Sequence, residues 1–90
     1  MSWGIIEEDE FRAELNCIIP NPKESDAFLE GAILYLSNFA DLEPQLDNTE
    51  MYYKTVPCPR IGRIVVIWYT IEERVVLRSA TSFKIPDDPL

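Results

Sequence analysis

One stretch of the chain, residues 63–83, limits the folds open to it more than any other. Six apolar residues run without a break from Ile64 to Tyr69, a charged tip follows at Glu72 and Glu73, and a β-rich run goes from Val75 to Phe83. β-Branched and aromatic residues in two runs joined by a short polar turn predict a β-hairpin. An unbroken apolar run is typical of a strand covered on both faces. We therefore expect strands over 63–70 and 75–83, joined by a turn over 71–74, at the centre of a small sheet.

Two further strands are indicated, both at the margins of this sheet. Residues 51–56 are β-rich, but Pro57 and Pro59 follow them and lack the N–H donors that a central strand needs. This segment is therefore expected at an edge, where it also offers two copies of the chain a place to pair as a homodimer. Residues 3–6 suit a short first strand.

The clearest helix begins after Asn21. Asn21 is a suitable N-cap, Pro22 suits the first helical position, and Glu24 stands where a capping box places its carboxylate. One apolar stripe then recurs at helical spacing, formed by Phe28, Leu29, Ala32, Ile33, Leu36 and Phe39. This helix is expected to cover the sheet, and residues 41–50, with Pro44 and four acidic residues, to form a solvated connector.

Residues 11–19 fit a helix and a strand about equally well. Phe11, Leu15, Ile18 and Ile19 fall at helical spacing, whereas Phe11, Ala13, Leu15, Cys17 and Ile19 alternate as on a half-buried strand. The acidic run of residues 7–10 suits the first turn of a helix, because the helix dipole favours anions there. A helix is preferred, and the strand stays open.

Ninety residues with 47% apolar content predict one α+β domain over residues 1–84. The expected fold is a small antiparallel sheet of three to four strands with one or two N-terminal helices packed on one face, in the order β-α-α-β-β-β. Residues 85–90 contain two prolines and are expected to form a mobile tail. The longest apolar run is too short for a membrane span, and the N-terminus lacks a basic start, so we expect a cytoplasmic protein with no membrane partner.

Several kinds of chemistry are excluded by residue types alone. The chain has no histidine and two cysteines, Cys17 and Cys58, so one chain cannot assemble a usual zinc site, and no metal or cofactor is expected. Its three glycines are too scattered for a phosphate loop. The cysteines are interpreted as two ordinary thiols, with a disulfide between them left open.

Cationic and aromatic side chains gather in the second half of the chain, although the net charge is −8. Residues 1–50 hold 12 acidic and 2 basic residues, whereas residues 51–90 hold 4 acidic and 6 basic ones. The group on or beside the predicted strands consists of Lys54, Arg60, Arg63, Arg74, Arg78, Tyr52, Tyr53 and Tyr69. If several lie on one concave side of the sheet, they can clamp a phosphodiester. In the alternative interpretation, Arg63 and Arg74 flank strand ends and pair with the acidic half.

The predicted order of elements resembles the RelE/ParE family of bacterial toxin–antitoxin systems. The residues that carry the resemblance are Tyr53-Lys54, then Arg60, Gly62 and Arg63, then the apolar strand ending in Tyr69, then residues 71–76. The resemblance implies an mRNA endonuclease or translation inhibitor, or for the ParE type an action on gyrase. RNA or the ribosome and an antitoxin-like protein are its implied partners. It further implies Lys54, Arg63 and Arg78 as catalytic residues, and Arg60, Tyr53 and Tyr69 as substrate-binding residues.

A second function, from a different class, follows from the charge. The sequence pI is about 4.3, and a net negative field opposes the phosphate contacts that supply most RNA affinity. The alternative is therefore a non-enzymatic, acidic protein-interaction module, or one that mimics nucleic acid. A RelE/ParE-like scaffold that has lost its nuclease activity is one form of it.

Overall fold

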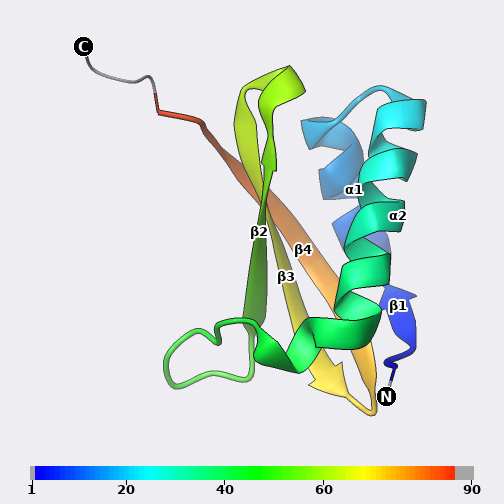
Figure 1. The fold of residues 1–90 in the computed structure, drawn as a ribbon, viewed down its shortest axis with the longest axis vertical. Coiled ribbons are helices and arrows are strands. Elements are labelled where there is room, and N and C mark those ends of the chain that lie inside the picture. The colour runs from blue at the N-terminus through cyan, green and yellow to red at the C-terminus, as the bar shows by residue number, and fades with distance from the viewer. Residues whose placement is uncertain (1, 87–90) are drawn as a thin grey trace.

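A four-stranded sheet with both helices on one of its faces makes up the fold (Figure 1). The computed structural model describes residues 2–86. The elements, in chain order, are β1 (Ile5–Glu7), α1 (Asp9–Ile18), α2 (Pro22–Phe39), the 3₁₀-helix η1 (Ala40–Leu42), β2 (Tyr52–Cys58), the 3₁₀-helix η2 (Pro59–Ile61), β3 (Arg63–Glu72) and β4 (Arg74–Lys84). The predicted α+β class and β-α-α-β-β-β order are confirmed.

The strands lie in the order β1-β4-β3-β2, so the predicted hairpin β3–β4 occupies the middle. The pairs β2–β3 and β3–β4 are antiparallel, but β1 pairs in parallel with β4, with Ile5 opposite Val75. The sheet is thus mixed rather than wholly antiparallel. β2 forms one edge as expected, and it runs through Pro57 because an edge strand can leave one side of its ladder without donors.

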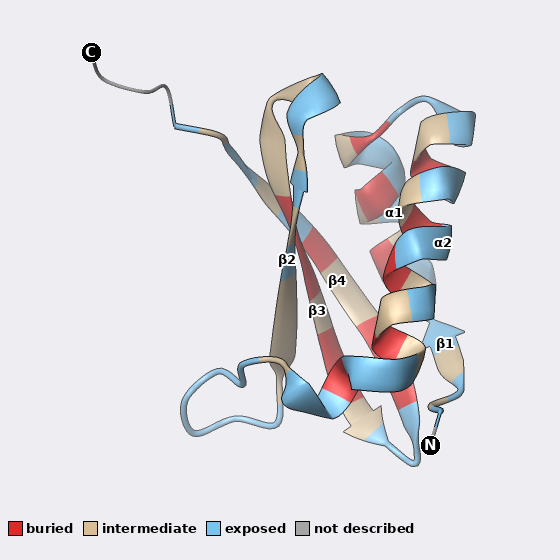
Figure 2. Ribbon diagram, in the orientation of Figure 1, coloured by how far each residue is buried: buried red, intermediate tan, exposed pale blue. Residues whose placement is uncertain are grey.

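The core fills the space between the helices and one face of the sheet (Figure 2). It joins Phe11, Leu15 and Ile19 near α1, Leu29, Ala32, Leu36 and Ala40 near α2, and Val65, Ile67, Tyr69, Val75, Leu77 and Ala80 from β3 and β4. The ambiguous segment 11–19 is therefore mainly helical, with Phe11 and Leu15 fully buried. Phe39 departs from the predicted stripe of α2 and is 45% exposed, because it is the last helical residue before η1.

The start of α2 follows the expected cap in part. The Asn21 side chain accepts hydrogen bonds from the backbone N–H groups of Lys23 and Glu24, at 3.0 and 3.3 Å. The carboxylate of Glu24 does not close a capping box, since it pairs with Arg60 instead. The cap therefore depends on Asn21, and Glu24 links α2 to η2.

The turn between β3 and β4 is shorter than predicted. β3 extends to Glu72 and β4 begins at Arg74, so Glu73 alone lies between them, in the left-handed region with φ 63°.

Past the end of β4, Ile85 N–H donates to the Gly62 carbonyl at 2.9 Å, so the predicted tail starts with an anchored residue. The remainder of that tail, residues 87–90, lies outside the described residues.

Candidate functional site

Arg78, one predicted catalytic residue, lies on the sheet face opposite the helices. The β3–β4 register shifts between Trp68 and Tyr69, which pair with Ser79 and Leu77, so Arg78 is the extra residue of a β-bulge. Its guanidinium donates to Glu8 at 2.9 Å, to Glu72 at 2.7 Å and to Thr70 Oγ1 at 3.0 Å. Arg78 is thus occupied by two carboxylates and ties β4 to the start of α1.

Lys54 lies on the other face, under α2. Strand alternation places it with Tyr52, Val56 and Cys58, which pack against the core. Its Nζ is 3.5 Å from a Glu43 carboxylate oxygen and 4.3 Å from the ring centroid of Tyr35. Glu43 also accepts the Tyr35 hydroxyl hydrogen bond at 2.6 Å, which raises the pKa of that phenol. Lys54 is therefore part of a small polar group that links β2 to α2.

Arg60 and Arg63 sit at the far end of the sheet from the β3–β4 turn. Arg63 Nε donates to Ser82 Oγ at 2.7 Å, and Arg63 stands opposite Lys84 in the ladder. The Arg60 side chain is 83% exposed and contacts Glu24 at 3.2 Å. Neither is close in register to Arg78, which lies at the bulge in the middle of β4.

The two tyrosines predicted to bind substrate occupy different environments. Tyr53 packs against Trp68 on the helix-free face, with ring centroids 5.4 Å apart. Tyr69 is a core residue with 0% exposure, and its hydroxyl donates to the Ala40 carbonyl at 2.6 Å. Burial raises the pKa of Tyr69, so its hydroxyl stays protonated and serves the junction of α2 and η1.

The structure therefore does not bring Lys54, Arg63 and Arg78 together. Lys54 and Arg78 lie on opposite faces of the sheet, and each has a carboxylate partner. The sequence held a signal for the face on which Lys54 lies. Tyr52, Val56 and Cys58 stand at every second position with Lys54, so the four side chains share one face of β2. A signal for the bulge was present too, in the three-residue step from Leu77 to Ala80 between core positions of β4.

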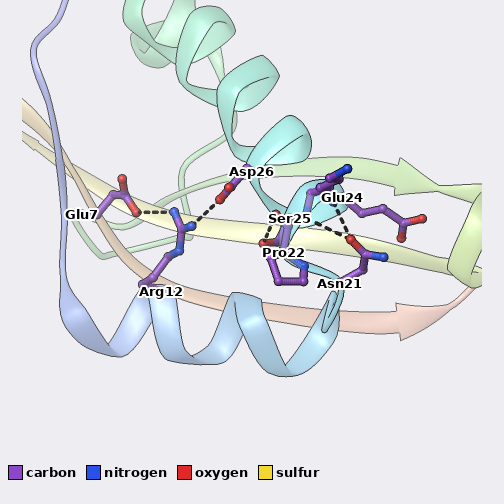
Figure 3. A network of polar contacts seen from close by, with 8 residues as sticks. Glu7, Arg12, Asn21, Pro22, Glu24, Ser25 and Asp26 are labelled. Carbon is purple, nitrogen blue, oxygen red and sulfur yellow. Dashed lines mark hydrogen bonds and ion pairs between the residues drawn. The ribbon is translucent and has the colours of Figure 1, made fainter.

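Arg12 shows the same use of a cation for structure (Figure 3). Its guanidinium bridges Glu7 at 3.4 Å and Asp26 at 2.6 Å, so β1, α1 and α2 meet at one side chain. The hydrogen bond to Asp26 raises the pKa of Arg12. The same view shows Asn21 at the start of α2.

An apolar groove between α2 and β2 was not predicted. It consists of two adjoining hollows of about 240 and 340 Å³, both lined by Ala27 and Phe28. The first continues along Ile19, Cys58, Pro59 and Ile61 to the Glu24–Arg60 pair, and the second along Gly31, Ala32, Tyr35 and Val56 to Lys54. A Cβ on Gly31 would meet no atom within 4 Å. The sequence signal for this groove is the small pair Ala27 and Gly31, one helical turn apart.

Charge is distributed unevenly along the long axis of the molecule, although Arg74 lies next to Glu73 at one end and Glu24 lies in the first turn of α2 at the other. In Figure 1, η1, the connector to β2 and the β3–β4 turn lie at the lower end. We call this the acidic end, defined by Asp41, Asp47, Glu50 and Glu73, which form no ion pair among residues 2–86. The upper end holds α2's first turn, η2, and the outer ends of β3 and β4, with Lys23, Arg60, Arg63 and Lys84. Glu43, at the Lys54 end of the groove, belongs to the connector of the acidic end.

The two cysteines are interpreted from the sequence as ordinary thiols. Cys17 and Cys58 are free thiols, and burial raises the pKa of Cys58, which weakens it as a nucleophile at neutral pH. Within the described part of the chain, no three metal-ligating side chains cluster, and no helix has the length and apolar character to cross a membrane.

The outer edge of β2 is largely blocked to another strand. Tyr53 N–H points outward and donates to the Pro44 carbonyl at 3.1 Å, so alternation directs Thr55 and Pro57 outward as well. Pro57 has no N–H, which leaves Thr55 with the one free outward donor of this strand in the described region. Backbone pairing of two copies at β2 would therefore be short.

Comparison with known proteins finds no matching family model, no matching curated protein and no matching solved structure.

Proposed function

We propose that this chain is a non-enzymatic interaction module on a RelE/ParE-like scaffold, and that its acidic end docks a basic protein partner. The observation that carries the proposal is the placement of the cations. Lys54 and Arg78 each contact a carboxylate on separate faces of the sheet, so no phosphate clamp forms from them. The acidic end, in contrast, presents carboxylates without ion-pair partners among the described residues.

Docking of a basic partner follows from electrostatics. A net charge of −8 raises the local concentration of cationic partners and lowers that of nucleic acid. Exposed carboxylates that are not already paired can form new contacts without breaking internal ones. Such contacts mainly speed association and give specificity, and they weaken with salt.

A toxin of the RelE/ParE type is the second candidate, and the order of elements favours it. The two candidates are separated by inducing the full chain in a bacterial host and following growth and mRNA integrity. The module leaves growth and ribosome-dependent mRNA cleavage unchanged. Growth arrest that is lost in both Arg63→Ala and Arg78→Ala, with each variant still folded, would establish the toxin instead.

The docking itself is tested with a matched pair of charge variants. Asp47→Asn/Glu50→Gln removes two carboxylates from the acidic end, and Asp9→Asn/Glu10→Gln removes two at the start of α1. Proteins captured on the wild-type chain from cells that encode it should be released at high salt. They should bind the first variant more weakly than the second. Equal loss in both variants would show that only net charge matters, and no loss in either would refute docking at carboxylates.

A further inference from the structure

The groove between α2 and β2 lies where a partner held at the acidic end would reach next. From the Glu24 position to the Tyr35 position, α2 advances roughly 16 Å, about three helical turns. Phe28, Val56 and Ile61 line the groove, and the outward neighbour Leu34 is 69% exposed. Leu42, in η1 at the acidic end, is 72% exposed. Apolar side chains are therefore exposed on α2 and in η1 outside the groove as well.

The floor of the groove admits close backbone approach. Ala27 and Gly31 are exposed on α2, and a side chain at Gly31 would find open space. Glycine inside a helix costs about 1 kcal/mol relative to alanine, and α2 carries it at this position. Small residues one turn apart let a second helix pack closely against the first.

Backbone hydrogen bonding selects a helix over an extended segment as the occupant. The groove lies on the face of the sheet that the helices cover. This face presents side chains, whereas the backbone N–H and C=O groups of the strands lie in the plane of the sheet. The nearest edge, that of β2, has lost donors at Tyr53 and Pro57. An extended peptide would thus leave its own N–H and C=O groups unpaired, whereas a helix satisfies them internally.

The charged residues at the groove decide whether a basic or an acidic helix binds there. Both bases that line the groove are already paired, Arg60 with Glu24 and Lys54 with Glu43. The groove opens at Lys54 and Tyr35 toward the acidic end, where carboxylates have no such partners. A helix with lysines or arginines flanking its apolar stripe gains there, and an acidic helix is repelled.

We propose that the groove between α2 and β2 is the docking site for a basic amphipathic helix of a partner protein. This inference rests on the proposed function and names the chemistry of its partner. The apolar stripe of the helix packs on Ala27, Phe28, Gly31 and Val56, and its basic residues lie toward the acidic end.

Three synthetic peptides of about 14 residues, long enough for the groove, serve as probes. The first contains leucine and lysine with the leucines at helical spacing. The second replaces each lysine by glutamate, and the third has the composition of the first in strict alternation. Each is titrated into the full-length, ¹⁵N-labelled chain at two salt concentrations, and amide shifts and dissociation constants are measured.

We expect the first peptide to bind about tenfold or more tightly than the other two. We also expect it to shift the amides of Gly31, Tyr35, Val56 and Cys58. Gly31→Gln, which fills the open floor while improving helix propensity, should weaken this binding about tenfold. Ala13→Gln, at an exposed position of α1, is the matched control and should leave it unchanged.

The remaining outcomes each decide against the groove. Equal binding of the alternating lysine peptide, with shifts at the acidic end only, would overturn the groove and leave the proposed function standing. Binding of the glutamate peptide in preference would overturn both. Binding of none of the three would overturn the groove, and the charge variants would then decide the proposed function on their own. A dimer of the free chain that Gly31→Gln converts to a monomer would make a second copy the occupant and refute a partner helix.

Discussion

Replacing Arg78 with alanine tests whether this arginine serves structure or catalysis. The change removes two charge-assisted hydrogen bonds, to Glu8 and Glu72, and one bond to Thr70 Oγ1. Because the Arg78 side chain is 33% exposed, each carboxylate contact is screened and contributes about 0.5 kcal/mol. The bond to Thr70 adds about 0.5–1 kcal/mol. Arg78→Ala should therefore lower the free energy of unfolding by about 1.5–2 kcal/mol.

Urea denaturation of the wild type and the variant at neutral pH measures this loss. Arg74→Ala is the control, since Arg74 is exposed and forms no ion pair among the described residues, and it should change stability by less than about 0.5 kcal/mol. Near about 1 M salt the deficit of Arg78→Ala should shrink toward the Thr70 contribution, because exposed ion pairs are screened.

The structural role of Arg78 is refuted if Arg78→Ala and Arg74→Ala have the same stability. A loss that does not depend on salt would refute the contribution of the two carboxylate contacts and leave the bond to Thr70.

Three further changes test the core, a cap and a turn. Tyr69→Phe leaves the buried Ala40 carbonyl without its partner and should cost about 1–3 kcal/mol in urea denaturation. Since the pKa of Tyr69 is raised above its ordinary value of 10.0, the phenol's contribution is complete below about pH 10 and is lost as pH rises toward the folded-state value. Wild type should therefore lose more stability than Tyr69→Phe above about pH 10, and parallel pH curves would contradict this. Asn21→Ala removes the acceptor that caps α2 and should cost about 1 kcal/mol in thermal unfolding, whereas an unchanged Tm would show that the cap is dispensable. Glu73→Gly relieves a left-handed residue and should add about 0.5–1 kcal/mol, and a loss of stability would show that φ at Glu73 carries no strain.

Much of the fold could be predicted from local patterns. The unbroken run from Ile64 to Tyr69 identifies the central strand by its β-branched and aromatic residues. The expected cover on both faces is wrong, because the helices cover the face of Val65 and Ile67 and leave Trp68 on the other face partly exposed. Asn21 and Pro22 mark the start of α2. The Asn21 side chain accepts hydrogen bonds from backbone N–H groups of the first turn, and proline has its φ fixed at a helical value. The parallel pairing of β1 with β4 could not be predicted, since a three-residue strand carries too few side chains to specify a partner.

The candidate site was harder to predict, for a different reason. Residue types indicated which side chains could bind phosphate, but their faces depend on register. The bulge at Arg78 changes the alternation of β4 by one residue, and the step from Leu77 to Ala80 that signals it does not say which residue is the extra one. The groove depends on the spacing between α2 and β2, which is set by tertiary packing rather than by either segment alone.

The pairing of β1 with β4 also orders events during synthesis. Ile5 leaves the ribosome before its partner Val75, which is made about seventy residues later. Until then the outer flank of the sheet cannot be completed, and Phe11 and Leu15 have no finished surface to pack against. We therefore expect Phe11 and Leu15 to stay exposed in the nascent chain, to solvent or to a chaperone, until the β3–β4 hairpin emerges.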